Sequence, residues 1–148
     1  AARMARAYGY VFQAAGLYPW RTISGNIKLP LEIMGYNKQE QLKRVARVIE
    51  LVELSGFENK YPWQLSGGMQ QRASIARALA FDADILLMDE PFSNLDEDLK
   101  DVFIPNLKSL FQRHQLTVII ATHHQRDIDL LAPKVLYLEN GSLVDKKG

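Results

Sequence analysis

Two carboxylates stand at the end of an apolar run in the segment Ile85-Leu86-Leu87-Met88-Asp89-Glu90. An unbroken run of this kind is typical of a strand that is buried on both faces in a parallel sheet. Ligands of open α/β folds bind at the carboxyl ends of such strands. There, Asp89 could hold Mg²⁺, which prefers hard oxygen ligands, and Glu90 could accept a proton from an attacking water. A solvated strand end is the alternative interpretation of this acidic pair.

A second candidate site lies upstream, in the segment Leu65-Ser66-Gly67-Gly68-Met69-Gln70-Gln71-Arg72. Ser66 is a good N-cap residue for the helix that follows. Gly67 and Gly68 leave the first backbone N–H groups unobstructed, and a helix N-terminus attracts anions. Two glycines in a first turn cost helix stability, on the order of 1 kcal/mol each. That cost favours close approach of a ligand over the alternative of an ordinary capped helix.

Two more polar side chains follow predicted strands. His123 comes directly after the expected strand Thr117–Ala121 and Thr122, where it could reach a bound phosphate. His124 is its neighbour, and either ring could simply be exposed. Gln13 follows the expected strand Tyr8–Phe12 and could ligate Mg²⁺ or position a water. Neither position carries the argument alone.

Helices alternate with these strands. A capping-box-like start at Asn37 and Glu40 predicts a helix from Asn37 to Leu54, with Gly56 at the position that follows a helix C-terminus. A second helix is expected from Ser66 to Ala80. Two sets of apolar residues at helical spacing are expected on the buried faces of the first helix and of a third, later helix: Leu42, Val45, Ile49 and Val52, then Leu99, Phe103, Leu107 and Leu110.

The end of the chain reads as a hairpin. Val135–Leu138 and Leu143-Val144 flank Asn140-Gly141, a dipeptide that favours a type I′ turn. Pro105 lies inside the third expected helix and should kink it. Strands that alternate with helices predict an α/β fold with a parallel sheet. We expect an α/β core from residues 1–23 and 81–148, with a mainly helical insertion from residues 24–80.

Composition excludes several classes of protein. A length of 148 residues is typical of a single domain. The 47% hydrophobic and 24% charged residues are ordinary for a globular protein. A net charge of +1 argues against a nucleic-acid binder driven by bulk charge. No cysteine is present, so disulfides and thiolate metal sites are excluded. No apolar run approaches the roughly 20 residues that span a bilayer, and Arg3 and Arg6 precede no secretory apolar region. If the protein acts at a membrane, we expect a partner protein to hold it there.

The segment Leu17-Tyr18-Pro19-Trp20 is aromatic and apolar. It could belong to the core or form a docking surface for a partner helix, and the sequence leaves both open. Trp63 is expected to serve in packing.

In this order and spacing, the motifs resemble those of the ATP-binding subunits of ABC transporters. Leu65–Arg72 is similar to the signature motif of that family, and Ile85–Pro91 to its Walker B strand. Three further segments look like its Q-loop, D-loop and H-switch: Tyr10–Gln13, Ser93–Asp96 and Thr122-His123. The resemblance covers the chain from about Gly9 to Val144.

The resemblance implies a P-loop NTPase fold of the ABC ATPase type, with ATP and Mg²⁺ as ligands. Two such subunits sandwich two ATP molecules, and the second subunit is either the same chain or a different one. Within a subunit, Gln13 and Asp89 would serve the metal, and Glu90 and His123 the hydrolysis. Residues of the signature and D-loop would face the nucleotide and interface shared with the partner: Ser66, Gly67, Gly68, Gln70 and Asp96.

The same resemblance implies a place in the cell. Residues 13–35 would contact membrane-spanning subunits, which would put the chain in the cytoplasm on the inner face of the membrane. The segments Leu17–Trp20 and Ile27–Glu32 look most like importer subunits. No nucleic-acid partner is expected.

The 148 residues contain no match to G-x-x-x-x-G-K-[ST], the loop that cradles nucleotide phosphates. We therefore expect a piece of such a domain, with an incomplete sheet core and no tight ATP binding on its own. The sheet should have an edge strand with unpaired backbone N–H and C=O groups. Such an edge would leave the chain marginally stable or able to pair with another chain. His124 also departs from the family pattern, which usually places an acid after the switch histidine.

A non-catalytic module is the alternative. Such a chain would offer its signature helix to the ATP of an intact subunit and regulate or assemble a complex without hydrolysis. Chromosome-maintenance ATPases share the signature but carry long coiled coils before it, and the stretch from Gln13 to Leu65 is too short for one.

Overall fold

A three-stranded parallel sheet forms the centre of the molecule. The computed structural model describes residues 7–131 and 133–145, so Arg3 and Arg6 lie outside the described residues. The strands β1 (Tyr8–Val11), β2 (Ile85–Asp89) and β3 (Thr117–Ala121) lie in the order β1-β2-β3. Their register places Tyr10 opposite Leu87, and Leu87 opposite Ile119. The predicted α/β class with a parallel sheet is confirmed.

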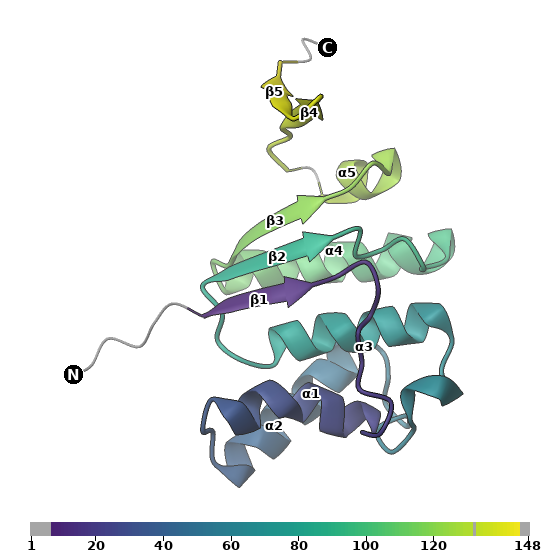
Figure 1. Ribbon diagram of the computed structural model, residues 1–148, viewed down its shortest axis with the longest axis vertical. Helices are drawn as coiled ribbons and strands as arrows, with labels where there is room; N and C mark the ends of the chain where they lie inside the picture. The colour runs from purple at the N-terminus through teal and green to yellow at the C-terminus, as the bar shows by residue number, and fades with distance from the viewer. Residues whose placement is uncertain (1–6, 132, 146–148) are drawn as a thin grey trace, which may run out of the picture.

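Helices cover one face of this sheet (Figure 1). The connections between the strands carry α1 (Ile23–Ile33), α2 (Lys38–Leu51), the short 3₁₀ helix η1 (Pro62–Gln64), α3 (Gly67–Leu79) and α4 (Glu97–Arg113). The covered face contributes Val11, Leu86 and Met88 to a single core that also holds apolar side chains of α1 to α4. Gly9 packs closely here: a Cβ would lie 2.7 Å from Cδ1 of Leu86 and 3.2 Å from the carbonyl oxygen of Ala78, so a larger residue would force the Leu86 side chain to shift.

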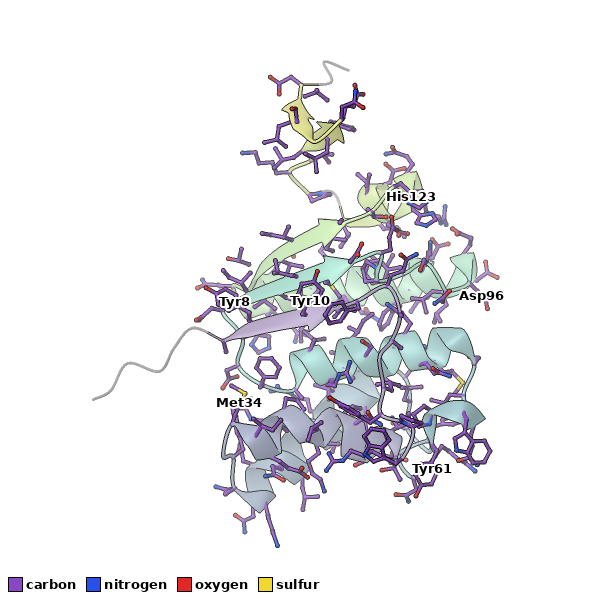
Figure 2. All side chains as sticks on the ribbon, in the orientation of Figure 1. Tyr8, Tyr10, Met34, Tyr61, Asp96 and His123 are labelled. Carbon is purple, nitrogen blue, oxygen red and sulfur yellow. The ribbon has the colours of Figure 1, made fainter. Side chains whose placement is uncertain are left out.

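The opposite face of the sheet is exposed in the described residues. Tyr8, Tyr10 and Ile119 are 58%, 46% and 59% exposed, and Figure 2 shows both tyrosines projecting from this face. The expectation that Ile85–Met88 forms a strand buried on both faces is therefore wrong within residues 7–131 and 133–145, where Ile85 and Leu87 of β2 are only partly buried. In the part of the chain that the structure describes, helices pack against only one side, and β3 also stands at an edge of the sheet.

Side-chain caps begin three of the helices. Thr22, Asn37 and Ser66 each accept a hydrogen bond from a backbone N–H in the first turn of α1, α2 and α3. The caps at Asn37 and Ser66 were predicted. Glu40, the expected partner in a capping box, instead accepts a hydrogen bond of 2.8 Å from Nε of Arg44.

The end of α2 differs from the prediction. The helix stops at Leu51, and Glu53 adopts the left-handed conformation with φ 59°. Gly56 lies further along, in the loop, with φ 94°. Leu42 was expected on the buried face but is 67% exposed, whereas Val45, Ile49 and Val52 are buried as predicted.

The remaining elements lie beyond β3. Helix α4 continues through Pro105 without interruption, and α5 (Gln125–Leu131) follows β3. The predicted hairpin is confirmed as β4 (Tyr137–Glu139) and β5 (Ser142–Val144), with Asn140 and Gly141 at φ 49° and 78°. No helix among the described residues is long and apolar enough to cross a membrane.

Candidate functional site

The carboxyl ends of the three strands meet at one edge of the sheet, where the arrowheads point in Figure 1. Two clusters of predicted residues lie at this edge. One gathers around Glu90, and the other around the N-terminus of α3. Asp96 and His123, one from each cluster, are labelled beyond the strand ends in Figure 2.

Glu90 is the centre of the first cluster. It follows β2 directly, with φ 44°, and its N–H donates to the carbonyl of Ala121 at the end of β3. This bond of 2.8 Å brings the two strand ends together. The left-handed backbone is uncommon for a residue with a side chain. It turns the chain away from the sheet, and the Glu90 side chain remains only 13% exposed.

Three groups hold the Glu90 carboxylate. Nδ1 of His123 lies 2.5 Å from Oε1, and the backbone N–H of His123 donates to the same oxygen at 3.1 Å. The hydroxyl of Thr122 donates to Oε2 at 3.2 Å. Partial burial would raise the pKa of Glu90, but the hydrogen bonds from His123 and Thr122 outweigh it and lower the pKa below its ordinary value. Glu90 is therefore ionised near neutral pH.

His124 also reaches this carboxylate. Its Nε2 lies 3.6 Å from Oε2 of Glu90, and its ring stacks on the ring of His123 with centroids 4.2 Å apart. The sequence singled out His123 and gave no role to His124. Thr122 was not among the predicted functional residues. Its position between the end of β3 and His123 could have indicated that its hydroxyl lies near the site.

The second cluster surrounds the start of α3. Oγ of Ser66 accepts the N–H of Met69 at 3.2 Å, which is the expected cap. A Cβ on Gly68 would lie 2.8 Å from the carbonyl oxygen of Asn94, whereas a Cβ on Gly67 would meet no described atom within 4 Å. Packing therefore requires glycine at position 68 and does not require it at position 67.

Asp96 lies beside this helix start. The two segments line one cavity of about 330 Å³, between residues 66–69 and residues 94–96. Asp96 is exposed at the N-cap of α4, but its side chain makes no capping hydrogen bond among the described residues. Its carboxylate is thus available to a ligand or a partner.

Gln70 has a different environment from the glycines. Its side-chain amide donates to the carbonyl oxygens of Pro62 and Leu65 at 2.9 and 3.3 Å. These bonds tie α3 to the preceding turn, so in this structure Gln70 supports the loop that carries Ser66.

Gln13 and Asp89 lie at the same edge and are both exposed. They follow or end the neighbouring strands β1 and β2, whose register pairs Val11 with Met88. Among the residues that the structure describes, no hydrogen bond or ion pair joins the side chain of Gln13 or Asp89 to the Glu90 cluster. Their amide and carboxylate oxygens are ligands that suit Mg²⁺.

The aromatic loop after Gln13 is mostly exposed. Trp20 is 71% exposed, and its ring lies 5.2 Å from the ring of Tyr18. Of the four residues of this loop, Leu17 packs against the core. The core interpretation thus fails for the aromatic residues. Trp63 was expected to pack but is 72% exposed.

Asn26 holds this loop and was not predicted. Its side chain is fully buried, accepts the N–H of Tyr18 at 2.7 Å, and donates to the carbonyls of Tyr18, Arg21 and Thr22. An asparagine inside an apolar helix is a weak signal in sequence because its partners lie in an irregular loop.

Comparison with known proteins agrees with these motifs. Residues 1–93 match the family model described as ABC transporter. The chain is 43% identical over 130 residues to the uncharacterised ABC transporter ATP-binding protein MJ0412 of Methanocaldococcus jannaschii, with 88% of this chain and 49% of that protein covered. It is 43% identical to the methionine import ATP-binding protein MetN 2 of Bacillus licheniformis, with 92% and 40% covered.

Solved structures show the same fold. The dimeric structure of the bacterial ABC transporter cassette MJ0796 superposes with a TM-score of 0.78 at 36% identity, covering 84% of this chain and 56% of that one. A post-hydrolysis state of that cassette, bound to ADP and Pi, gives a TM-score of 0.84 at 34% identity, covering 93% and 61%. The chain thus spans about half the length, or less, of the curated relatives MJ0412 and MetN 2.

Proposed function

Because the chain belongs to the ABC transporter family, we propose that it carries the signature, Walker B and H-switch portion of a subunit that hydrolyses ATP to drive solute transport. The observation that supports this best is the Glu90 carboxylate, held ionised beside His123 at the carboxyl edge of a parallel sheet. A proton acceptor must be deprotonated at the working pH and must be oriented toward the water. Glu90 is ionised near neutral pH, and His123 fixes the orientation of its carboxylate.

Glu90 acts as the proton acceptor for the attacking water in this proposal. His123 orients the carboxylate through Nδ1 and its backbone N–H, and Thr122 fixes the other oxygen. His123 is 78% exposed, so its ring can move toward a bound phosphate while the backbone bond to Glu90 persists. Asp89 and Gln13 would hold Mg²⁺, which neutralises charge that develops on the phosphate oxygens.

Ser66, Gly67 and Gly68 recognise the γ-phosphate of an ATP held by a second subunit. The open space over Gly67 and the cavity shared with Asp96 support this role. Gln70 supports the loop, and Asp96 contacts the partner subunit. The partner is a second copy or a related ATP-binding subunit, since the cassette to which this chain is similar is dimeric.

Tight ATP binding needs groups that these 148 residues do not supply in the usual form. A phosphate loop provides a row of backbone donors, a lysine charge and a metal-binding hydroxyl. We therefore expect calorimetric titration of MgATP into the folded 148-residue chain to detect no tight binding. Micromolar binding would mean that another segment replaces the loop, and the chain would then have to be treated as a complete enzyme.

The pairing of the signature residues with a partner's ATP is tested by complementation. An intact ATP-binding subunit of the methionine importer type is inactivated at its own signature serine and mixed with this chain. The proposal expects phosphate release to recover, and Ser66→Arg in this chain to prevent the recovery. A Ser109→Arg variant, at an exposed position of α4, is the control for folding. No recovery with the unchanged chain would contradict the pairing.

Residues 13–35 contact membrane-spanning subunits in this proposal, which places the chain in the cytoplasm on the inner face of the membrane. The exposed pair Tyr18 and Trp20 supports a docking surface there. Import is favoured over export because curated relatives are named as import proteins.

A non-catalytic module is the second candidate, favoured by one specific observation. Residues 66–69 and 94–96 line one cavity that a partner's nucleotide could approach, whereas no segment of the 148 residues matches a phosphate loop. In this version the chain modulates hydrolysis by an intact subunit, and Glu90→Gln leaves that effect unchanged.

A further inference from the structure

We propose that Glu90, His123 and His124 form a binding site for a transition-metal ion such as Zn²⁺. One carboxylate oxygen and one ring nitrogen from each histidine all lie within 4.8 Å of one another. A carboxylate with two imidazoles is a ligand set that proteins use for Zn²⁺ while leaving a coordination position open. Imidazole also suits copper and nickel.

The geometry brings the donors toward a common point. Nδ1 of His123 lies 2.5 Å from Oε1 of Glu90, and Nε2 of His124 lies 3.6 Å from Oε2. The two rings lie in tilted contact, with 32° between their planes, and each ring has a nitrogen near the same carboxylate. A small separation of the first pair would admit an ion, since Zn²⁺ binds such ligands at about 2.0–2.2 Å.

Supporting contacts and access are also present. The Thr122 hydroxyl and the His123 N–H fix the carboxylate, as outer contacts do for metal ligands. Thr122 in addition accepts the backbone N–H of His124 at 3.1 Å, which orders the segment that carries both rings. The rings are 78% and 36% exposed, which leaves a path for an ion from solvent.

This site differs from the magnesium position. Mg²⁺ takes oxygen ligands and keeps several waters, whereas two of the three donors here are nitrogens. The consequence for activity rests on the proposed function. An ion on Glu90 and both histidines would remove the carboxylate from its role as proton acceptor, so Zn²⁺ would inhibit hydrolysis in the assembled ATPase.

The sequence makes a direct test possible because the chain has three histidines and no cysteine. Co²⁺ is titrated into the nucleotide-free 148-residue chain, and its visible absorption is followed. Zn²⁺ is then used to displace it, and calorimetry measures the Zn²⁺ affinity. We expect one ion per chain and a loss of affinity of about tenfold or more for His124→Gln, equivalent to about 1.4 kcal/mol.

His114→Gln is the matched control, since this exposed histidine ends α4 away from the site. Circular dichroism checks that each variant is folded. Glu90→Gln should weaken Zn²⁺ binding as His124→Gln does. No cobalt band, or a band lost in His114→Gln and retained in His124→Gln, would overturn the proposal.

The readout separates this inference from the proposed function. Zn²⁺ binding is measured without nucleotide or partner. Zn²⁺ binding by the unchanged chain, together with no recovery of phosphate release in the complementation assay, would contradict the proposed function and leave the metal site intact. Recovery of phosphate release without Zn²⁺ binding by the unchanged chain would refute the metal site alone.

Discussion

Arg77 on α3 donates a hydrogen bond of 3.0 Å to the carbonyl oxygen of Gly16, in the loop that follows β1. A second bond of 3.0 Å reaches the carbonyl of Ala15. Burial lowers the pKa of this guanidinium, which nevertheless stays charged because arginine titrates far above neutral pH. The helix that carries the signature therefore fixes the loop that leads from Gln13 to the aromatic segment.

Replacing Arg77 should loosen that loop. We expect Arg77→Met to cost about 1.5–3 kcal/mol of unfolding free energy, the range for hydrogen bonds that involve a charged group. Amide exchange should quicken between Phe12 and Tyr18. Urea unfolding and hydrogen exchange measure the two effects. Arg47→Met, at an exposed position of α2, is the control. Equal loop protection in the Arg77 variant and the wild type would contradict this coupling.

Glu90 should make stability depend on pH. Its pKa in the folded chain lies below the ordinary value of about 4.5. The unfolded state therefore binds the proton more readily than the folded state. The resulting stabilisation is fully present above pH 4.5 and is lost as the pH falls through the lower, folded pKa. We expect urea unfolding of Glu90→Gln to lack this component, so that its deficit relative to wild type shrinks in acid. A constant deficit across that range would refute the assignment.

A buried ion pair joins α4 to α5. Nζ of Lys100 lies 3.0 Å from Oδ1 of Asp127, and the two side chains are 3% and 1% exposed. Removing one partner leaves an unpaired buried charge, so Lys100→Met should cost about 3–5 kcal/mol. The double variant Lys100→Met with Asp127→Leu should recover much of this loss. Urea unfolding of the four proteins in the cycle measures the coupling, and additive losses would mean that the pair is not coupled.

The two signature glycines should respond differently to alanine. Gly68→Ala should destabilise the chain because the new Cβ would press on the Asn94 carbonyl at 2.8 Å. Gly67→Ala should be neutral or stabilise α3 by up to about 1 kcal/mol, the helix preference of alanine over glycine. Both variants should lower phosphate release in the complementation assay. Full activity of the stable Gly67→Ala variant would show that nothing approaches the backbone there.

The sequence predicted those parts of the fold that depend on neighbours in the chain. The caps at Asn37 and Ser66 and the Asn140-Gly141 turn are local, and all three are confirmed. Exposure was less predictable because it depends on what packs against an element. The apolar pattern of β3 indicates a strand, yet it cannot report that Ile119 faces no helix in the described residues.

For the candidate site, the sequence predicted the main residues but not all of the contacts between them. Glu90 and His123 each follow a strand of the parallel sheet, so the sequence predicted that both lie at the carboxyl edge of the sheet. The contacts of Thr122 and His124 with Glu90 depend on the backbone path after β3 and could not be read from residue spacing. Helix α1 was not bounded in advance because Pro30 lies inside it, and its buried Asn26 was missed with it.

Trp20 and Trp63 offer a matched test of the docking surface. They are 71% and 72% exposed, so neither substitution by alanine should cost much stability. Trp20 stacks near Tyr18 in a loop that Asn26 holds with four hydrogen bonds. A rigid, exposed aromatic side chain is a typical anchor at a protein interface. We therefore expect Trp20→Ala to weaken co-purification with membrane-spanning subunits at least about tenfold, the effect of losing about 1.4 kcal/mol of binding energy, and Trp63→Ala to leave it unchanged. Equal losses in the two variants would place the contact outside this loop.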